Sequence, residues 1–398
     1  MAICMIMVLV ITFQVRLVDC EPEVNRSRTL YVPYMSVKQK GKSDNESANA
    51  SMSVRTGREC FRALSMPEAV TLASGVYRVR ASVPSGSKAT ADMVQTDEAF
   101  WTIFSFHFLS GAAFTKADCD AGLTRAVLDA TTARKLFGTT DAVGRTVQLD
   151  YVDYTVAGVV ADVSMLATAA YAQIWVPYTA AGADAMSWRD DTMGPMHAII
   201  LARSSADFDA IREETELLRK KYNDGLQDVE VFYRGQPDTQ LAYLYRRWYA
   251  EPDVPGVMLR YAIVVIILLL VPAVNLSGMT LSRMRRRMAE IGVRKAFGAT
   301  GGELMRQVFF ENLVLTLLAG IVGLVLSYVA TFALNGFLFS NSMNASLSGE
   351  TALTPGMLLS PWAFIAAFAF CLLMNILSAG IPAWRASRMN ITDAINQR

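Results

Sequence analysis

Two long apolar stretches separated by one short basic connector restrict the fold of this chain more than any other feature of its sequence. The stretches cover residues 257–281 and 308–335, and the connector covers residues 283–306. As a helix, each stretch would rise by more than roughly 30 Å, which is the thickness of the hydrocarbon core of a bilayer. We therefore predict that both stretches are transmembrane helices.

The charge of the connector predicts its side of the membrane. Its basic residues outnumber its acidic residues, which are Glu290 and Glu303. Anionic lipids and the membrane potential retain Lys and Arg on the cytoplasmic side. We therefore expect a cytoplasmic connector. The basic residues are Arg283, Arg285, Arg286, Arg287, Arg294, Lys295 and Arg306.

The connector also carries local structural signals. Gly298 suits the C-terminus of one helix, and Thr300-Gly301-Gly302-Glu303 fits a capping box that would begin the next helix at Thr300. Between them, residues 289–299 would form a short elbow with apolar side chains among charges. Such an elbow either docks into a groove on a soluble partner or only fixes the topology and contacts lipid headgroups. The residues alone leave both interpretations open.

A longer stretch of sequence favours docking. The run MAEIGVRKAFGATGGELMRQVFFENLVLTLLAGIVGLVLS resembles the corresponding segment of MacB/FtsX-type ABC transporter permeases. In that family, the segment docks onto an ATP-binding subunit. The resemblance implies that residues 290–299 couple this chain to such a subunit. The predicted coupling residues are Glu290, Ile291, Gly292, Val293, Arg294, Lys295, Ala296, Phe297, Gly298 and Ala299.

Residues 1–18 are apolar except for Gln14 and Arg16. They lack the positive n-region and the small-residue cleavage site of a signal peptide. The residues before Cys20 also lack the small side chains that precede a lipidated cysteine. We therefore predict a retained first transmembrane helix that leads outward.

Charge and polarity are concentrated between residues 19 and 255, which predicts an extracytoplasmic domain inserted between membrane helices. Alternation and turn residues predict its elements. The predicted strands are 76–80, 146–149, 154–160, 173–177, 197–202 and 229–233. The predicted helices are 60–70, 126–137, 206–222 and 240–249, and residues 36–57 are predicted to be an exposed loop. Residues 97–108 are rich in aromatic side chains and are predicted to be core.

The same domain resembles the periplasmic core domain of the MacB-type permeases. The matching runs, in order, are TDEAFWTIFSFHFLSGAAFTKAD, ARKLFGTTDAVGRTVQLD, YTVAGVVADV and AQIWVPYT. We therefore expect a two-lobed α+β domain at residues 19–255.

The C-terminal part, residues 256–398, is predicted to be an FtsX-like permease domain. A short outer loop precedes a fourth membrane helix at residues 361–383. The predicted fold class is thus a membrane α-helical protein of four transmembrane helices with an inserted α+β domain. Small residues at Ala319, Gly323 and Ser327 would allow close helix packing. Asn275 would be unfavourable at membrane depth unless it is paired with a neighbouring helix.

The sequence offers little for chemistry. His107 and His197 have no His, Cys or carboxylate at metal-ligand spacing, and no Walker A, G-x-S-x-G or H-E-x-x-H sequence occurs. We therefore predict no catalytic residue, no metal and no cofactor in this chain. The family resemblance implies that ATP is bound by the partner subunit. The formal net charge of +1 gives no reason to expect nucleic-acid binding. Cys20, Cys60 and Cys119 have no tight spacing, so no disulfide is required.

The resemblance implies a permease subunit of the inner membrane that moves a periplasmic domain when a separate ATPase closes on nucleotide, for export or efflux. Its expected partners are that ATPase, a second identical or different permease, a periplasmic adaptor and membrane lipids. One alternative is a relay that uses the same motion to control a cell-wall hydrolase or a sensor. Another is an anchored binding protein without an ATPase, which the coupling motif disfavours.

Overall fold

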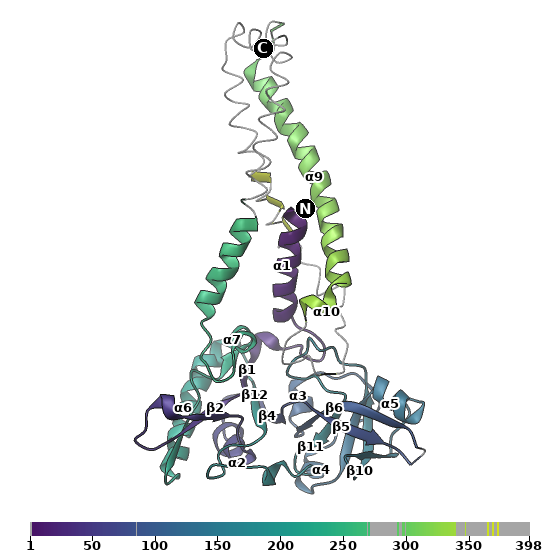
Figure 1. The fold of residues 1–398 in the computed structure, drawn as a ribbon, viewed down its shortest axis with the longest axis vertical. Coiled ribbons are helices and arrows are strands. Elements are labelled where there is room, and N and C mark those ends of the chain that lie inside the picture. The colour runs from purple at the N-terminus through teal and green to yellow at the C-terminus, as the bar shows by residue number, and fades with distance from the viewer. Residues whose placement is uncertain are drawn as a thin grey trace. The chain divides into compact units, whose positions relative to one another are not determined.

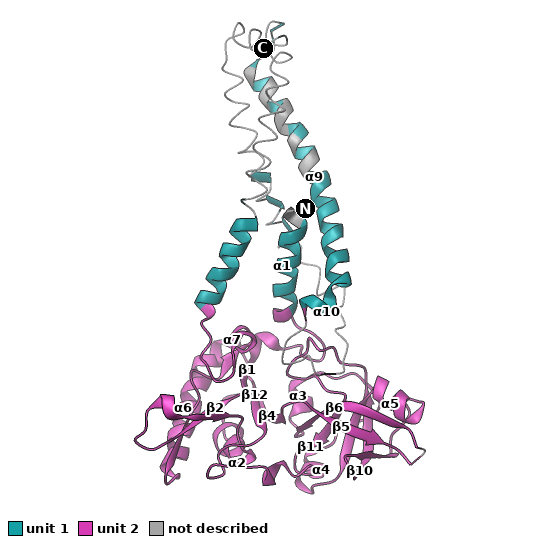
Figure 2. Ribbon diagram, in the orientation of Figure 1, with its two compact units in different colours: residues 1–15, 255–338, 354–398 teal, residues 16–254, 339–353 magenta. Residues whose placement is uncertain are grey.

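The computed structural model describes residues 2–84, 86–268, 270, 293, 297–298, 300–339, 347, 364–365, 368–369 and 372–373. The ribbon of the chain is drawn in Figure 1, and Figure 2 colours its two compact units. Unit 1 comprises Met1–Val15, Pro255–Leu338 and Thr354–Arg398, and unit 2 comprises Arg16–Val254 and Phe339–Leu353.

Unit 1 is helical in its described parts. Its elements are most of α1 (Ala2–Leu17), α9 (Gly301–Ala333), α10 (Asn335–Leu338) and the helical residues 255–268. The predicted capping box is confirmed at the start of α9. The Thr300 hydroxyl accepts from the Glu303 amide at 3.3 Å, and the Glu303 carboxylate accepts from the Thr300 amide at 2.9 Å. In the part of the chain that the structure describes, no helix is both long and apolar enough to cross a membrane.

A large mixed sheet forms the centre of unit 2 (Figure 1). Its strands follow the order β11-β8-β10-β9-β5-β6-β4-β12-β1-β14, and β7 pairs with β10. Most neighbours are antiparallel, while β8 with β10 and β6 with β11 are parallel. The strands are β1 (Thr29–Val32), β4 (Ala69–Ser74), β5 (Tyr77–Ser82), β6 (Lys88–Thr96), β7 (Phe108–Gly111), β8 (Arg125–Asp129), β9 (Thr146–Leu149), β10 (Val152–Val160), β11 (Ile174–Pro177), β12 (Met196–Leu201) and β14 (Asp238–Thr239).

The two hydrophobic cores of unit 2 define two lobes. The first lobe contains β14, β1, β12 and β4, with α2 (Val54–Gly57), the π-helical turn η3 (Arg58–Arg62), α6 (Phe208–Asp224) and a small sheet of β13 (Val229–Phe232), β2 (Met35–Gln39) and β3 (Ala48–Ala50). The second lobe contains β5, β6, β8, β9, β10 and β11 with α5 (Ala130–Phe137). The expectation of a two-lobed α+β domain is confirmed.

Local sequence signals explain several of these elements. The hairpin of β9 and β10, the strands β5, β11, β12 and β13, and the helix α6 confirm the predictions for those segments. Helix α5 begins where the Asp129 side chain accepts from the Thr132 amide, and it ends at Gly138 with φ +74°. That left-handed conformation carries no steric cost for glycine.

Three predictions were wrong. The helix predicted at 60–70 ends at Arg62, because residues 69–74 pair with β12 as strand β4. Residues 126–129 belong to strand β8, so the helix predicted at 126–137 is only α5. Residues 36–57 are not an exposed loop, because they contain the paired strands β2 and β3. Ser36 donates to Asn49 across that pair at 2.6 Å, so polar side chains there are satisfied within the fold.

Two further expectations concern the ends of predicted segments. The helix predicted at 240–249 is shorter, since α7 covers Gln240–Tyr245. The aromatic cluster at 97–108 contains α3 (Phe100–Ile103) and is core in part, with Phe100 and Phe104 buried. The predicted fourth helix at 361–383 lies almost entirely outside the described residues.

Candidate functional site: two arginine clamps and a joint in the sheet

The first clamp, which we call the N-terminal clamp, is built around the buried ion pair of Arg26 with Glu23. Arg26 donates to the Glu23 carboxylate at 2.7 Å, to the Val18 carbonyl at 2.6 Å and to the Leu166 carbonyl. Glu23 in turn accepts from the backbone amides of residues 169 and 170, at 2.6 and 3.0 Å. The clamp therefore fastens the segment after α1 to the 164–171 loop.

The charges of this clamp are stabilised by each other. The side chains of Arg26 and Glu23 are each about 1% exposed. Burial by itself would lower the pKa of Arg26, but the Glu23 carboxylate outweighs it and raises that pKa above its ordinary value. A buried charge of this kind is tolerated only when it is paired and hydrogen-bonded.

The second clamp, the C-terminal clamp, is built around Arg246 and Asp238. The Arg246 guanidinium forms a two-pronged pair with Asp238, with Nη2 to Oδ1 at 2.8 Å. It also donates to the Ala250 carbonyl at 3.0 Å and to the Arg234 carbonyl at 3.1 Å. Asp238 lies on β14, which pairs with β1 at the margin of the large sheet. The clamp therefore fastens residues 246–250 to that margin.

The two clamps occupy equivalent places in the chain. The N-terminal clamp lies just after residue 16, where unit 2 begins, and the C-terminal clamp lies just before Val254, where its main segment ends. A guanidinium that bonds several carbonyls and a carboxylate at once fixes its neighbours in direction as well as in distance. Both covalent connections of the main segment of unit 2 are thus held to its folded body by buried arginines.

The joint between the lobes is the third part of the site. Strands β4 and β6 share a single register pair, Ala73 with Thr96, whereas β4 with β12 and β5 with β6 pair along their lengths. Because the ladder between β4 and β6 is so short, side chains form hydrogen bonds in place of further backbone pairs. Thr96 Oγ1 donates to the Leu72 carbonyl at 3.0 Å, and Ser74 Oγ accepts from the Gln95 amide at 2.9 Å.

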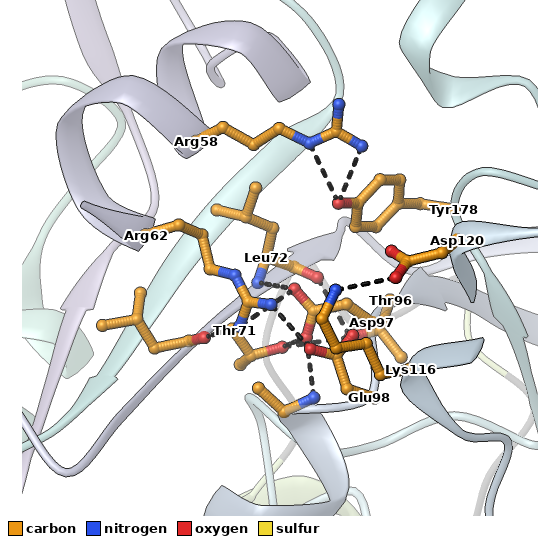
Figure 3. A network of polar contacts seen from close by, with 12 residues as sticks. Arg58, Arg62, Thr71, Leu72, Thr96, Asp97, Glu98, Lys116, Asp120 and Tyr178 are labelled. Carbon is orange, nitrogen blue, oxygen red and sulfur yellow. Dashed lines mark hydrogen bonds and ion pairs between the residues drawn. The ribbon is translucent and has the colours of Figure 1, made fainter. Parts of the chain in front are cut away.

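Asp97 is the most connected residue of the joint (Figure 3). Its carboxylate follows β6 in the second lobe, and it accepts from the Thr71 hydroxyl at 2.5 Å and from the Leu72 amide at 3.1 Å, both on β4 of the first lobe. Arg62 lies 3.8 Å away and binds Glu98 at 2.7 Å. Burial raises the pKa of Asp97 to about 6, against the opposing effect of Arg62 and its hydrogen bonds.

The predicted coupling residues lie in unit 1, and the structure describes Val293, Phe297 and Gly298 among them. The Phe297 side chain is 88% exposed and that of Val293 is 50% exposed. Gly298 has φ +95°, as expected of a residue that ends a helix. The other predicted coupling residues lie outside the described residues, namely Glu290, Ile291, Gly292, Arg294, Lys295, Ala296 and Ala299.

The predicted packing residues lie on α9, apart from Asn275, which is outside the described residues. Gly323 and Ser327 are buried, whereas Ala319 is exposed. The adjacent Gly320 is buried, and a Cβ built on it would lie 2.9 Å from the Phe368 ring. The small-residue face of α9 therefore includes Gly320.

Sequence reasoning missed the clamps and the joint. Arg26, Arg246 and Asp97 are single charges in mixed surroundings, so no spacing or motif distinguishes them from surface residues. Within the described residues, no group of His, Cys, Asp and Glu has the arrangement of a metal site. Cys20, Cys60 and Cys119 are free thiols, and burial raises the pKa of both Cys20 and Cys60 to about 11.

Removal of the C-terminal clamp should destabilise unit 2. We expect Arg246→Ala to lower its free energy of unfolding by about 3–5 kcal/mol, because Asp238 would be left buried without its counter-charge. The neighbouring Arg247 is exposed, so Arg247→Ala should change it by less than about 0.5 kcal/mol. Thermal unfolding of the full chain, followed by near-UV circular dichroism, measures both. Equal melting temperatures for the two variants would contradict the role of the clamp.

Asp97 should give unit 2 a pH-dependent stability. The pKa of Asp97 is near 6 in the folded chain, and its ordinary value, near 4, applies in the unfolded chain. Between pH 4 and pH 6, Asp97 is therefore protonated in the folded chain and ionised in the unfolded chain. Wild type therefore loses stability through Asp97 as pH rises from 4 to 6.

We expect the stability of Asp97→Asn relative to wild type to increase by about 3 kcal/mol between pH 4 and pH 7, at about 1.4 kcal/mol per pKa unit. Melting temperatures across that range measure the change. Asp120→Asn, at an exposed carboxylate, is the control and should change the stability by less than about 0.5 kcal/mol. A constant offset for Asp97→Asn would refute the assignment.

The sequence of this chain matches two known domain families and several known proteins. Residues 1–218 match the MacB-like periplasmic core domain, and residues 262–391 match the FtsX-like permease C-terminal domain. The macrolide export ATP-binding/permease protein MacB of Chromobacterium violaceum is 25% identical over 308 residues, which are 77% of this chain and 43% of that protein. The pyoverdine export ATP-binding/permease protein PvdT of Pseudomonas aeruginosa is 27% identical over 299 residues, which are 74% of this chain and 41% of that protein.

Among solved structures, the periplasmic region of MacB from Actinobacillus actinomycetemcomitans aligns at 16% identity with a TM-score of 0.37, covering 51% of this chain and 90% of that one. The extracellular domain of the transporter YknZ aligns at 16% identity with a TM-score of 0.36, covering 50% and 99%. The chain spans less than half the length of the curated relatives it matches. Because the MacB-like core domain alone covers more than half of the sequence and the FtsX-like domain follows it, the chain belongs to the MacB/FtsX-type family of ABC transporter permeases.

Proposed function

We propose that this chain is the permease subunit of an inner-membrane ABC transporter that passes mechanical work from an ATPase to unit 2 in the periplasm. ATP is bound and hydrolysed by a separate subunit, and this chain has no catalytic residue of its own. The work serves export or efflux from the periplasmic side. The observation that carries the proposal is the pair of buried arginine clamps at the two ends of the main segment of unit 2.

The clamps support this proposal because a displaced connection moves a domain only if the connection is rigid. A flexible linker at residue 18 or residue 250 would absorb displacement as a change in chain conformation. The bonds of Arg26 to Val18 and of Arg246 to Ala250 remove that freedom. Displacement of the preceding and following helices would then reach the 164–171 loop and the margin of the sheet directly.

Such motion also requires a place where the two lobes can rotate, and the joint between them is that place. Each lobe has its own hydrophobic core, and the sheet is continuous between them through one register pair. Domain motions concentrate at a few residues that absorb the change, while packed cores move as bodies. The joint at Ala73 and Thr96 is where the lobes of unit 2 would rotate.

The exposed Phe297 is the side chain we place in a groove on the ATPase. A groove on the ATPase would bury this ring, which is 88% exposed in this chain alone. It follows Val293 by one helical turn, and the Phe297 amide donates to the Val293 carbonyl at 3.1 Å. We place Glu290 and Arg294 beside it as the charged contacts. A second permease, which would use the small-residue face of α9, and a periplasmic adaptor complete the proposed complex.

Docking can be tested with two matched phenylalanines. We expect Phe297→Asp to reduce co-purification of the ATPase with the affinity-tagged full chain by at least tenfold, because a charge replaces the buried anchor. Phe337 is 80% exposed, and Phe337→Asp should retain the ATPase. Quantitative mass spectrometry of the native complex measures both. Loss in both variants, or in neither, would contradict docking through Phe297.

The orientation of the connector can be tested with single cysteines. We expect Arg294→Cys to react with a membrane-impermeant maleimide only after the cells are permeabilised. Tyr151 is 83% exposed in unit 2, so Tyr151→Cys should react in spheroplasts with intact membranes. The wild-type chain, with Cys20, Cys60 and Cys119 buried, gives the background. Labelling of position 294 from outside would exclude a cytoplasmic ATPase as its partner.

A further inference from the structure

A cavity of about 310 Å³ lies within unit 2 beside the joint. Its walls come from both halves of the sheet, with Val94 on β6 and Ala73, His197 and Tyr31 on β4, β12 and β1. Its volume is at the lower end of the roughly 300–1,000 Å³ of small-molecule sites. Among the described residues that line it, none is an aspartate, glutamate, lysine or arginine.

The polar groups of the cavity are neutral. His197 Nε2 lies 2.8 Å from Ser51 Oγ, and burial lowers the pKa of His197 to about 4, so the imidazole is uncharged at neutral pH. A serine hydroxyl and a neutral imidazole offer both donor and acceptor capacity. A carboxylate or an ammonium group would lose its hydration here without gaining a counter-charge, which is strongly unfavourable.

Aromatic side chains shape the remaining walls. The rings of Tyr31 and Tyr243 stack with centroids 4.5 Å apart and an interplanar angle of 15°. Tyr31 is 2% exposed, and its hydroxyl has no hydrogen-bond partner among the described residues. Flat, rigid walls of this kind favour a ring compound over a flexible chain, because less conformational freedom is lost on binding.

The cavity also adjoins the C-terminal clamp. The centroid of the Tyr34 ring, which lines the cavity, lies 6.1 Å from that of the His197 ring, and Tyr34 stacks on Trp248 with centroids 6.3 Å apart. Trp248 belongs to the segment that Arg246 holds, and its φ of +55° is rare for a bulky residue. An occupant would therefore contact both halves of the sheet and, through Tyr34, the clamped segment.

We propose that this cavity binds a small neutral ring compound that carries a hydroxyl group, and that binding is sensed at Trp248. The hydroxyl pairs with Ser51 and His197, and the ring lies against the tyrosines. The inference goes beyond the permease function, since binding requires neither ATP nor a second subunit.

The purified full chain can be tested with 2-naphthol as the probe. We expect saturable binding in equilibrium dialysis, together with a change in tryptophan emission that is lost in Trp248→Phe. The anion 2-naphthoate, of similar shape, should bind at least tenfold more weakly. Ser51→Ala should weaken 2-naphthol three- to tenfold and leave naphthalene unchanged. Equal binding of 2-naphthol and 2-naphthoate would overturn the proposal.

A cavity-filling variant separates binding in the cavity from partition into detergent. A Cβ at Gly75, which lines the cavity, would lie 3.8 Å from His197 Cε1, an ordinary van der Waals contact, and Gly75→Leu should reduce binding at least tenfold by filling the cavity. Val76→Phe, from the same turn, is the second filling variant if Gly75→Leu does not fold. Gly225→Leu, at the end of α6 and away from the cavity, should bind like wild type. Unchanged binding in a folded filling variant would refute the site.

Discussion

The pairing of each buried arginine with a carboxylate is the interaction on which unit 2 depends. Arg26 and Arg246 place full charges where the accessible surface is almost nil, and such a charge is strongly unfavourable in isolation. Both are stabilised by a carboxylate and by backbone carbonyls from separate segments. The hydrogen bonds therefore form as a set, because the loss of one acceptor leaves a charge only partly compensated. This makes the clamps stiff, and stiffness is the property that a mechanical role requires.

The two lobes contribute in a different way. Their cores are apolar and tightly packed, so each lobe resists deformation internally. The lobes share one sheet, but the strands that join them, β4 and β6, have a single register pair. Hydrogen bonds to the Asp97 carboxylate replace part of the missing ladder. Unit 2 thus combines rigid clamps at the ends of its main segment with a weaker joint between its two lobes. A cavity lined by neutral side chains lies next to that joint and next to the C-terminal clamp.

The family, the capping box at Thr300 and most of the strands with clear alternation could be predicted from sequence, because their signals are local. Strand β6 could not, since the buried Asp92 in its middle interrupts the pattern; Asp92 accepts from the distant Tyr171 hydroxyl at 2.8 Å and lies 3.7 Å from Arg78. Strands β2 and β3 were hidden by polar residues that bond across the pair. Arg26, Arg246 and Asp97 acquire their roles from partners that the chain brings together from far away in sequence, and no spacing reveals such partners.

The joint between β4 and β6, with its single register pair, affects how the sequence of this domain can change in evolution. A continuous backbone ladder has nearly the same strength whatever its side chains are, since every residue contributes the same amide and carbonyl. Here part of the cohesion between the lobes rests instead on the identities of Thr71, Ser74, Thr96 and Asp97. Each of these can be replaced without opening either hydrophobic core, so substitution can tune the ease of lobe rotation in small steps while the fold stays intact.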